Sequence, residues 1–227
     1  MEILEIPTKN KKIDVHQGDL EFELKPDQTN FPFKIINIVV LAKMKFADAE
    51  TKIDFDQLEK NIEVKRLNRF PCVLFKIDNI SIILFKNGKA IITGLKKHEQ
   101  INRIAKKMEK LLRNQGKLQF ESLSTEIQNL VIMSRLGKIV NLELACLTLT
   151  NCLYEPEQFP AAIVKTPHGG TFLIFSNSKI IGLGMRSMDM VRKSLKFLIN
   201  EIFENDLFIN LNVEEPLEDP FDDDFFF

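Results

Sequence analysis

The residues best suited to specific contacts are two asparagines, Asn37 and Asn129, each in the middle of an apolar run. The runs read IINIVVL over residues 35–41 and IQNLVIM over residues 127–133, which predicts two β-strands. Strands disfavour asparagine, and a buried carboxamide needs hydrogen-bond partners. Packing alone therefore explains these two side chains poorly, and a role in recognition explains them better.

Catalytic and metal-binding chemistry, in contrast, has no recognisable residues in this sequence. His16, His98 and His168 are isolated, and no cysteine or histidine spacing matches a metal site. The Asn-Gly-Lys and Ser-Asn-Ser-Lys segments are too short to be phosphate-binding loops. We therefore expect a binding protein rather than an enzyme, with no cofactor and no metal ion.

The first element that must position such residues is a predicted three-stranded antiparallel meander over residues 69–93. Phe70 opens its first strand, and Phe85 ends its second strand before an Asn-Gly turn. The third strand is expected to cover residues 90–93 and to stop at Gly94. Both phenylalanines thus stand at strand ends.

The same pattern returns over residues 158–184, which indicates an internal duplication. Several residues recur in one order at offsets of 89 to 92 positions: Asn37 with Asn129, Phe70 with Phe159, Phe85 with Phe175, and Lys89 with Lys179.

Helices complete each repeat. Asp54 is expected to cap a short helix within residues 52–62, and Ser187 to cap the last helix. A long helix over residues 98–113 has apolar residues at the 3.6-residue period. Residues 142–149 fit a helix or a strand, and residues 118–126 are expected to link the repeats. Antiparallel strands with helices on one face give an α+β fold whose other sheet face is bare.

The paired repeats resemble the TATA-box-binding protein family, as a divergent archaeal-like member. The resemblance covers residues 33–205 and rests on the two strand asparagines, the phenylalanines of RFP and QFP, the LF-x-x-GK and IF-x-x-SK turns, and the YEPE of residues 154–157. It implies a saddle in which two pseudo-symmetric repeats form one curved antiparallel sheet, with helices on the convex face.

The resemblance also implies a DNA-binding concave face. Its apolar and asparagine side chains would lie against the minor groove, where A·T pairs present only acceptors, its four phenylalanines would intercalate, and its cations would contact phosphates. From the residues alone, the phenylalanines also fit a core and the cations an ordinary surface. The implied DNA-binding residues are Asn37, Val39, Arg69, Phe70, Lys76, Ile83, Phe85, Lys89, Ile91, Thr93, Asn129, Val131, Phe159, Lys165, Leu173, Phe175, Lys179, Ile181 and Leu183.

The function that the resemblance implies is that of a general transcription initiation factor. It would bind A/T-rich TATA-box promoter DNA, bend it, and recruit a factor-B-type initiation factor and RNA polymerase. Tyr154, Glu155 and Glu157 would contact the factor-B-type partner, although spacing alone fits an acidic solvated turn equally well. Leu183 stands where the family usually has threonine, which removes one expected groove hydrogen bond. The alternative is therefore a regulatory module of this fold that binds transcription factors but DNA only weakly.

Composition supports a globular protein of 227 residues, with 44% hydrophobic and 28% charged residues. We expect an N-terminal extension (1–34), repeat 1 (35–116), repeat 2 (117–206) and an acidic, phenylalanine-rich tail (207–227). The net charge of −1 includes seven acids after residue 213, so the rest of the chain carries +6. The composition of the tail is typical of disorder. The N-terminal extension fits either a disordered arm or a short hairpin around Gln17-Gly18, within residues 13–24.

Cysteine usage and hydropathy indicate where the protein works. Three cysteines without metal-ligand spacing are expected to be reduced, buried thiols of an intracellular protein, in an archaeal cytoplasm and nucleoid or a eukaryotic nucleus. No apolar run approaches the roughly 20 residues that span a bilayer, so no membrane association is expected. The bare concave face would also allow a weak homodimer.

Overall fold

The computed structural model describes residues 31–67 and 70–209 of the chain. Arg69, the hairpin-like pattern within the N-terminal extension and the acidic segment after Ile209 lie outside the described residues.

One ten-stranded antiparallel sheet runs through the molecule, in the order β2-β3-β4-β5-β1-β6-β10-β9-β8-β7. The two repeats join where β1 pairs with β6, at the centre of this order. The strands are β1 (Lys34–Lys45), β2 (Lys65–Arg66), β3 (Cys72–Ile77), β4 (Ile80–Phe85), β5 (Lys89–Leu95), β6 (Ser122–Arg135), β7 (Cys152–Leu153), β8 (Ala161–Lys165), β9 (Thr171–Phe175) and β10 (Lys179–Met185).

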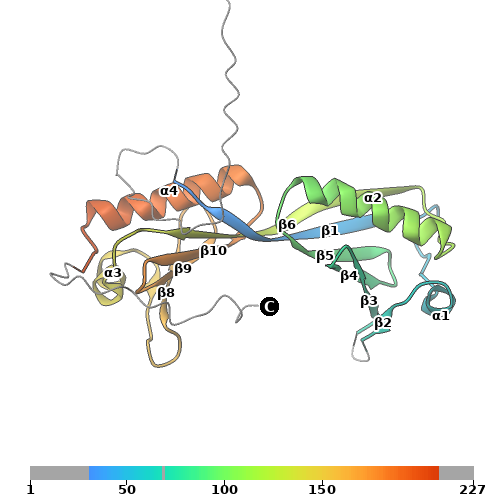
Figure 1. The fold of residues 1–227 in the computed structure, drawn as a ribbon, viewed down its shortest axis with the longest axis horizontal. Coiled ribbons are helices and arrows are strands. Elements are labelled where there is room, and N and C mark those ends of the chain that lie inside the picture. Colours follow the sequence, from blue (N-terminus) through green and yellow to red (C-terminus); the bar gives the residue numbers. More distant parts are fainter. Residues whose placement is uncertain (1–30, 68–69, 210–227) are drawn as a thin grey trace, which may run out of the picture.

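The long helices α2 (Glu99–Asn114) and α4 (Met188–Glu204) lie along one face of the sheet, and the short helices α1 (Phe55–Glu59) and α3 (Leu142–Thr148) lie at its two ends (Figure 1). The two ends of the sheet curve away from the long helices, so the face opposite these helices is concave. Among the described residues, this concave face carries no helix. The α+β saddle is therefore confirmed. None of the helices in the described ranges is long and apolar enough to cross a membrane.

Alternating burial along β1 explains how one strand serves two different faces. Ile38, Val40 and Ala42 are completely buried in the main core, under the helices. Asn37 and Val39 point to the other face and remain partly exposed. Because successive side chains of a strand point to opposite faces, an apolar run can fill the core and still leave an apolar concave surface.

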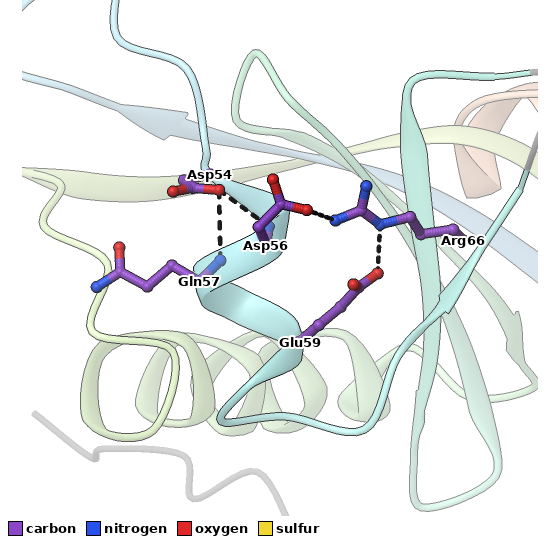
Figure 2. Close-up of polar contacts among 5 residues, drawn as sticks. All are labelled: Asp54, Asp56, Gln57, Glu59 and Arg66. Atoms are coloured by element: carbon purple, nitrogen blue, oxygen red, sulfur yellow. Dashed lines mark hydrogen bonds and ion pairs between the residues drawn. The ribbon is translucent and has the colours of Figure 1, made fainter.

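Helix ends follow the predicted caps. The Asp54 side chain accepts hydrogen bonds from Asp56 N and Gln57 N at 2.9 and 3.3 Å, as Figure 2 shows. Ser187 Oγ accepts from Met190 N at 3.1 Å. Residues 142–149, which the sequence left open between helix and strand, contain helix α3.

Three predicted boundaries were wrong. Strand β5 does not stop at Gly94 but continues to Leu95, because the glycine forms an irregularity within the strand. Phe70 precedes its strand, which begins at Cys72. The expected linker over residues 118–126 supplies the first five residues of β6, because Ser122 to Glu126 pair with β1, which extends to Lys45.

The two repeats tie their short helix to the edge of the sheet by different chemistry. In repeat 1 the Arg66 side chain on β2 donates to the carboxylates of Asp56 and Glu59 on α1 (Figure 2). In repeat 2 Cys146 on α3 forms a disulfide with Cys152 on β7. The expectation of three reduced thiols was therefore wrong for these two cysteines, and only Cys72 is a free, buried thiol.

The repeats also divide core volume differently at one matched cross-strand pair. In repeat 1 Ile82 of β4 lies opposite Ile92 of β5, whereas in repeat 2 Phe172 of β9 lies opposite Gly182 of β10. A Cβ atom on Gly182 would lie 2.6 Å from the Phe172 ring, which is closer than packed atoms approach. One large and one very small residue thus replace two of intermediate size.

Candidate functional site

The centre of the concave face is formed by Asn37 of β1 and Asn129 of β6, on the two strands that join the repeats. Asn37 lies opposite Val131, and Asn129 lies opposite Val39, so the two carboxamides are diagonal neighbours. This is the arrangement that a pseudo-twofold axis between the repeats requires. The structure therefore brings together two residues that are 92 positions apart in the sequence.

A glycine backbone group orients each carboxamide. Gly94 N donates to Asn37 Oδ1 at 3.0 Å, and Gly184 N donates to Asn129 Oδ1 at 2.8 Å. Because an N–H group must face an oxygen, each Nδ2 group points away from its glycine and remains a donor. The apolar strands thus carry asparagine because its acceptor is satisfied within the sheet.

Positive φ angles make these two glycines necessary. Gly94 has φ +96° and Gly184 has φ +79°, a region of backbone conformation in which residues other than glycine are strained. The strand register shifts beside both positions, as in a β-bulge, and this turns the N–H groups toward the asparagines. A Cβ atom would meet nothing closer than 3.9 Å at either glycine, so backbone conformation rather than space demands the residue.

The repeats differ in the residue before each glycine. Thr93 Oγ1 lies 3.5 Å from Asn37 Nδ2, at the outer limit of a hydrogen bond. The matched position in repeat 2 is Leu183, which has no hydroxyl group. The polar centre of the face is therefore asymmetric despite the matched asparagines.

Apolar side chains surround this centre on both sides. On the repeat 2 half, Ala161, Phe175 and Ile181 form a buried cluster, separate from the main core, against which further side chains pack. The predicted apolar residues, all of which lie on this face or its edge, are Val39, Ile83, Phe85, Ile91, Val131, Phe159, Leu173, Phe175, Ile181 and Leu183.

The four predicted wedge phenylalanines stand in matched places but differ in exposure. Phe70 and Phe159 precede β3 and β8 by two residues, and Phe85 and Phe175 end β4 and β9. Phe70 is 64% exposed, whereas Phe175 is 6% exposed. The rings of Phe159 and Phe175 meet edge to face, with centroids 6.2 Å apart. Repeat 1 therefore presents a ring to solvent, and repeat 2 holds its two rings together.

The predicted cations lie on strands of this face, except Arg69, which is outside the described residues. Lys76, Lys89 and Lys165 are exposed, whereas Lys179 is 8% exposed. The Lys179 side chain would therefore have to leave its buried position before it could contact a phosphate. Phosphate contact by these residues stays a prediction.

Two further cations that the sequence reasoning missed lie beside them. Lys43 of β1 lies directly opposite Lys89, and Arg135 of β6 lies directly opposite Lys179. Lys43 and Arg135 are 92 residues apart, the same offset that relates the two asparagines, so the repeat itself carried the signal. Each half of the face thus has a cross-strand pair of positive charges.

Glu126 of β6 partly neutralises the pair in repeat 1. Lys43 Nζ donates to Glu126 Oε2 at 3.2 Å. This hydrogen bond, together with the positive charge, lowers the pKa of the Glu126 carboxyl group. The ionised carboxylate competes with any other anion for Lys43.

The predicted partner residues lie on the loop between β7 and β8. Glu155 and Glu157 are exposed, and Tyr154 packs partly against the main core. Glu155 O accepts from the backbone N–H groups of Gln158 and Phe159 at 2.9 Å each. The acidic loop and the Phe159 ring therefore belong to one hydrogen-bonded turn.

Comparisons with known proteins agree with this geometry. The family model described as "Transcription factor TFIID (or TATA-binding protein, TBP)" matches residues 32–115 and 124–205. The TATA-box-binding protein of Thermococcus celer is 30% identical over 185 residues, covering 79% of this chain and 95% of that protein. The protein of the same name from Thermococcus kodakarensis is 32% identical over 185 residues, covering 78% and 93%. The solved structure of Methanococcus jannaschii TBP superposes with a TM-score of 0.68 at 27% identity, covering 76% of this chain and 98% of that one.

Proposed function

The chain belongs to the TATA-box-binding protein family, and on that basis we propose that it is a general transcription factor that binds TATA-box promoter DNA through its concave face. The observation that carries this proposal is an apolar sheet face that bears no helix among the described residues, with two oriented asparagines at its centre. An apolar surface of this kind on a folded protein marks a binding site.

The minor groove of A/T-rich DNA matches the chemistry of this face. A·T and T·A pairs present only the acceptors adenine N3 and thymine O2 there, whereas G·C pairs add the guanine amino donor. The Nδ2 groups of Asn37 and Asn129, whose Oδ1 atoms already accept from glycine N–H groups, can donate to those acceptors. The flanking apolar side chains would face a guanine amino group without offering it a partner, so we expect a preference for A/T-rich sequence.

Bending would come from phenylalanines that enter between base steps at the two edges of the face. This wedge-and-kink mechanism is the known mode of DNA binding of the family. Phe70, at 64% exposure, is already accessible for such contact. In repeat 2 the Phe159 and Phe175 rings would first have to separate.

Recruitment of a factor-B-type initiation factor, and through it RNA polymerase, is assigned to the loop that carries Tyr154, Glu155 and Glu157. The exposure of both glutamates supports this assignment, since they would face a basic partner surface. Their turn also holds Phe159, so partner binding and DNA bending would be physically linked.

The test is binding of A/T-rich and G/C-rich duplexes of equal length, labelled at both ends so that energy transfer reports bending. We expect tighter binding and a larger bend with the A/T-rich duplex, and loss of the repeat 1 kink in Phe70→Ala. Leu147→Ala is the matched control, because Leu147 is a large apolar side chain that is 86% exposed but lies on helix α3. Equal binding of both duplexes, or equal effects of both variants, would contradict the proposal.

A second candidate function is a regulatory module that binds transcription factors and DNA only weakly. The absence of a hydroxyl group at Leu183 and the burial of Lys179 favour it, because each removes a DNA contact from repeat 2. Binding of a purified factor-B-type protein without detectable binding of the A/T-rich duplex at low salt would establish this alternative.

A further inference from the structure

We propose that, in the absence of DNA, the C-terminal segment of residues 210–227 docks on the concave face of its own chain. The inference rests on the proposed function for its consequence, which is competition with DNA, but the docking itself can be tested without DNA.

The first argument is the chemistry of the segment. It contains seven carboxylates and no lysine or arginine, together with Phe221 and three consecutive phenylalanines at residues 225–227. DNA offers a binding protein the same combination of regularly spaced negative charge and flat aromatic rings. A segment with both features suits a face built to contact both.

The second argument is charge complementarity on the described part of the face. Lys89 lies directly opposite Lys43, and Arg135 lies directly opposite Lys179. Each pair concentrates positive charge at one place on the face, although Glu126 offsets part of it in repeat 1, and such a concentration of positive charge complements carboxylates. The aspartates at residues 222–224 directly precede the phenylalanines at residues 225–227. This short stretch can therefore contact the Arg135–Lys179 pair and the apolar cluster around Phe175 at the same time.

The third argument is where the described chain ends. Ile209 N donates to Ile139 O at 2.9 Å, and Phe208 forms a bridge with Val140. Ile139 follows Arg135, the last residue of β6, by only four positions. The segment therefore starts close to the cation pair of repeat 2.

The length of the segment is also sufficient. Eighteen residues beyond Ile209 can extend by about 60 Å, at roughly 3.3 Å per residue. Ten strands spaced about 4.8 Å apart span roughly 43 Å. The segment can thus reach any part of the face.

The N-terminal residues 1–30 suit the face less well. They contain four lysines among seven acids and a single phenylalanine, Phe22. A net charge of −3 spread over 30 residues is far weaker than −7 over 18, and one ring cannot fill the apolar cluster. These residues therefore provide an internal control.

The direct test places the photocrosslinking residue p-benzoylphenylalanine at Phe226 in the full-length protein, without DNA. We expect crosslinks within one chain to residues of the concave face such as Val131 and Leu173, and loss of these crosslinks when an A/T-rich duplex is added. The same residue at Phe22 should not give them. A crosslinked dimer would show that a second copy occupies the face, and crosslinks to helix residues, or equally frequent crosslinks from both positions, would also overturn the proposal.

The second test measures DNA binding by the full-length protein with the seven acids after residue 213 changed to their amides. A face that is occupied nine-tenths of the time should give roughly tenfold tighter binding of the A/T-rich duplex once the segment is released. The gain should shrink as salt rises, because the docking contacts are screened. Unchanged affinity would overturn the proposal while leaving the proposed function intact. Crosslinking to the concave face in a protein that binds no DNA would instead support the docking and contradict the proposed function.

Discussion

The oriented carboxamide of Asn129 allows DNA recognition to be separated from folding with one isosteric change. In Asn129→Asp, one carboxylate oxygen still accepts from Gly184 N, which lies 2.8 Å from Oδ1 in the wild type. The second oxygen replaces the Nδ2 donor and turns an acceptor toward the groove. The fold should therefore be retained while the contact with adenine N3 or thymine O2 is lost.

The size of the effect follows from the groups involved. A groove hydrogen bond disappears, and an acceptor is pressed against an acceptor in a desolvated contact, which together should cost about 2–3 kcal/mol of binding free energy. This corresponds to roughly a 30- to 150-fold increase in Kd for the A/T-rich duplex. The effect on a G/C-rich duplex should be smaller, because its binding depends mainly on charge.

The assay is a fluorescence titration of both duplexes at fixed salt, together with thermal unfolding of the free proteins. Gln57→Glu is the matched control, since it makes the same change from amide to acid at an exposed position on α1. If Asn129→Asp bound the A/T-rich duplex within about twofold of the control and unfolded at the same temperature, the carboxamide would not face the groove and the reasoning would be refuted.

Four further predictions concern features that differ between the two repeats. Gly182→Ile should destabilise the fold by about 1–3 kcal/mol, because the new side chain overpacks the core against Phe172. Adding Phe172→Ile should recover much of this loss, because the two changes recreate the isoleucine pair of repeat 1. Denaturant unfolding of both single variants and of the double variant measures the coupling between the two positions. Replacing Cys146 and Cys152 by serine should lower the free energy of unfolding by about 2 kcal/mol, since the closed loop is short, and should abolish any effect of reducing agent on the transition. Glu126→Gln should tighten DNA binding and steepen its salt dependence by about one unit of slope, because the paired lysine is released for a phosphate; an unchanged slope would exclude that lysine from the interface. The Lys43–Glu126 ion pair also lowers the pKa of the Glu126 carboxyl group in the folded protein. The stability that this ion pair contributes should therefore be complete above the ordinary carboxyl pKa and be lost as pH falls through the lower folded-state pKa. Titration of the Glu126 carboxyl group by NMR would show this lowered pKa.

The sequence predicted the architecture because the duplication provided a second copy of every signal. The α+β class, the sheet joined at its centre, the caps at Asp54 and Ser187, and the position of both asparagines agree with the structure. Strand ends were less predictable. Gly94 is a turn residue by type, yet here its positive φ lies inside a strand, where it serves a hydrogen bond to a side chain from another strand.

Other features of the site depend on three-dimensional neighbours that periodicity does not encode. The sequence treats Phe70 and Phe175 alike, but one ring is mostly exposed and the other is covered by Phe159 and its cluster. The cation pairs were overlooked because Lys43 and Arg135 stand at strand ends beyond the apolar runs. The disulfide was missed because a six-residue separation across a helix and a turn is not a recognised pattern.

The two ties between short helix and sheet edge make opposite ends of one molecule respond to different properties of their surroundings. The tie in repeat 1 consists of exposed ion pairs around Arg66, so dissolved salt weakens it. The tie in repeat 2 is covalent, so salt leaves it intact while a thiol reductant opens it. The loop with Glu155 and Glu157 begins two residues after Cys152, whereas Phe70, at the other end of the saddle, follows Arg66 of the ionic tie by four residues. Salt concentration should therefore change the stability of the repeat 1 end, and a reductant that of the repeat 2 end, each without the other. Two repeats with identical ties would respond together.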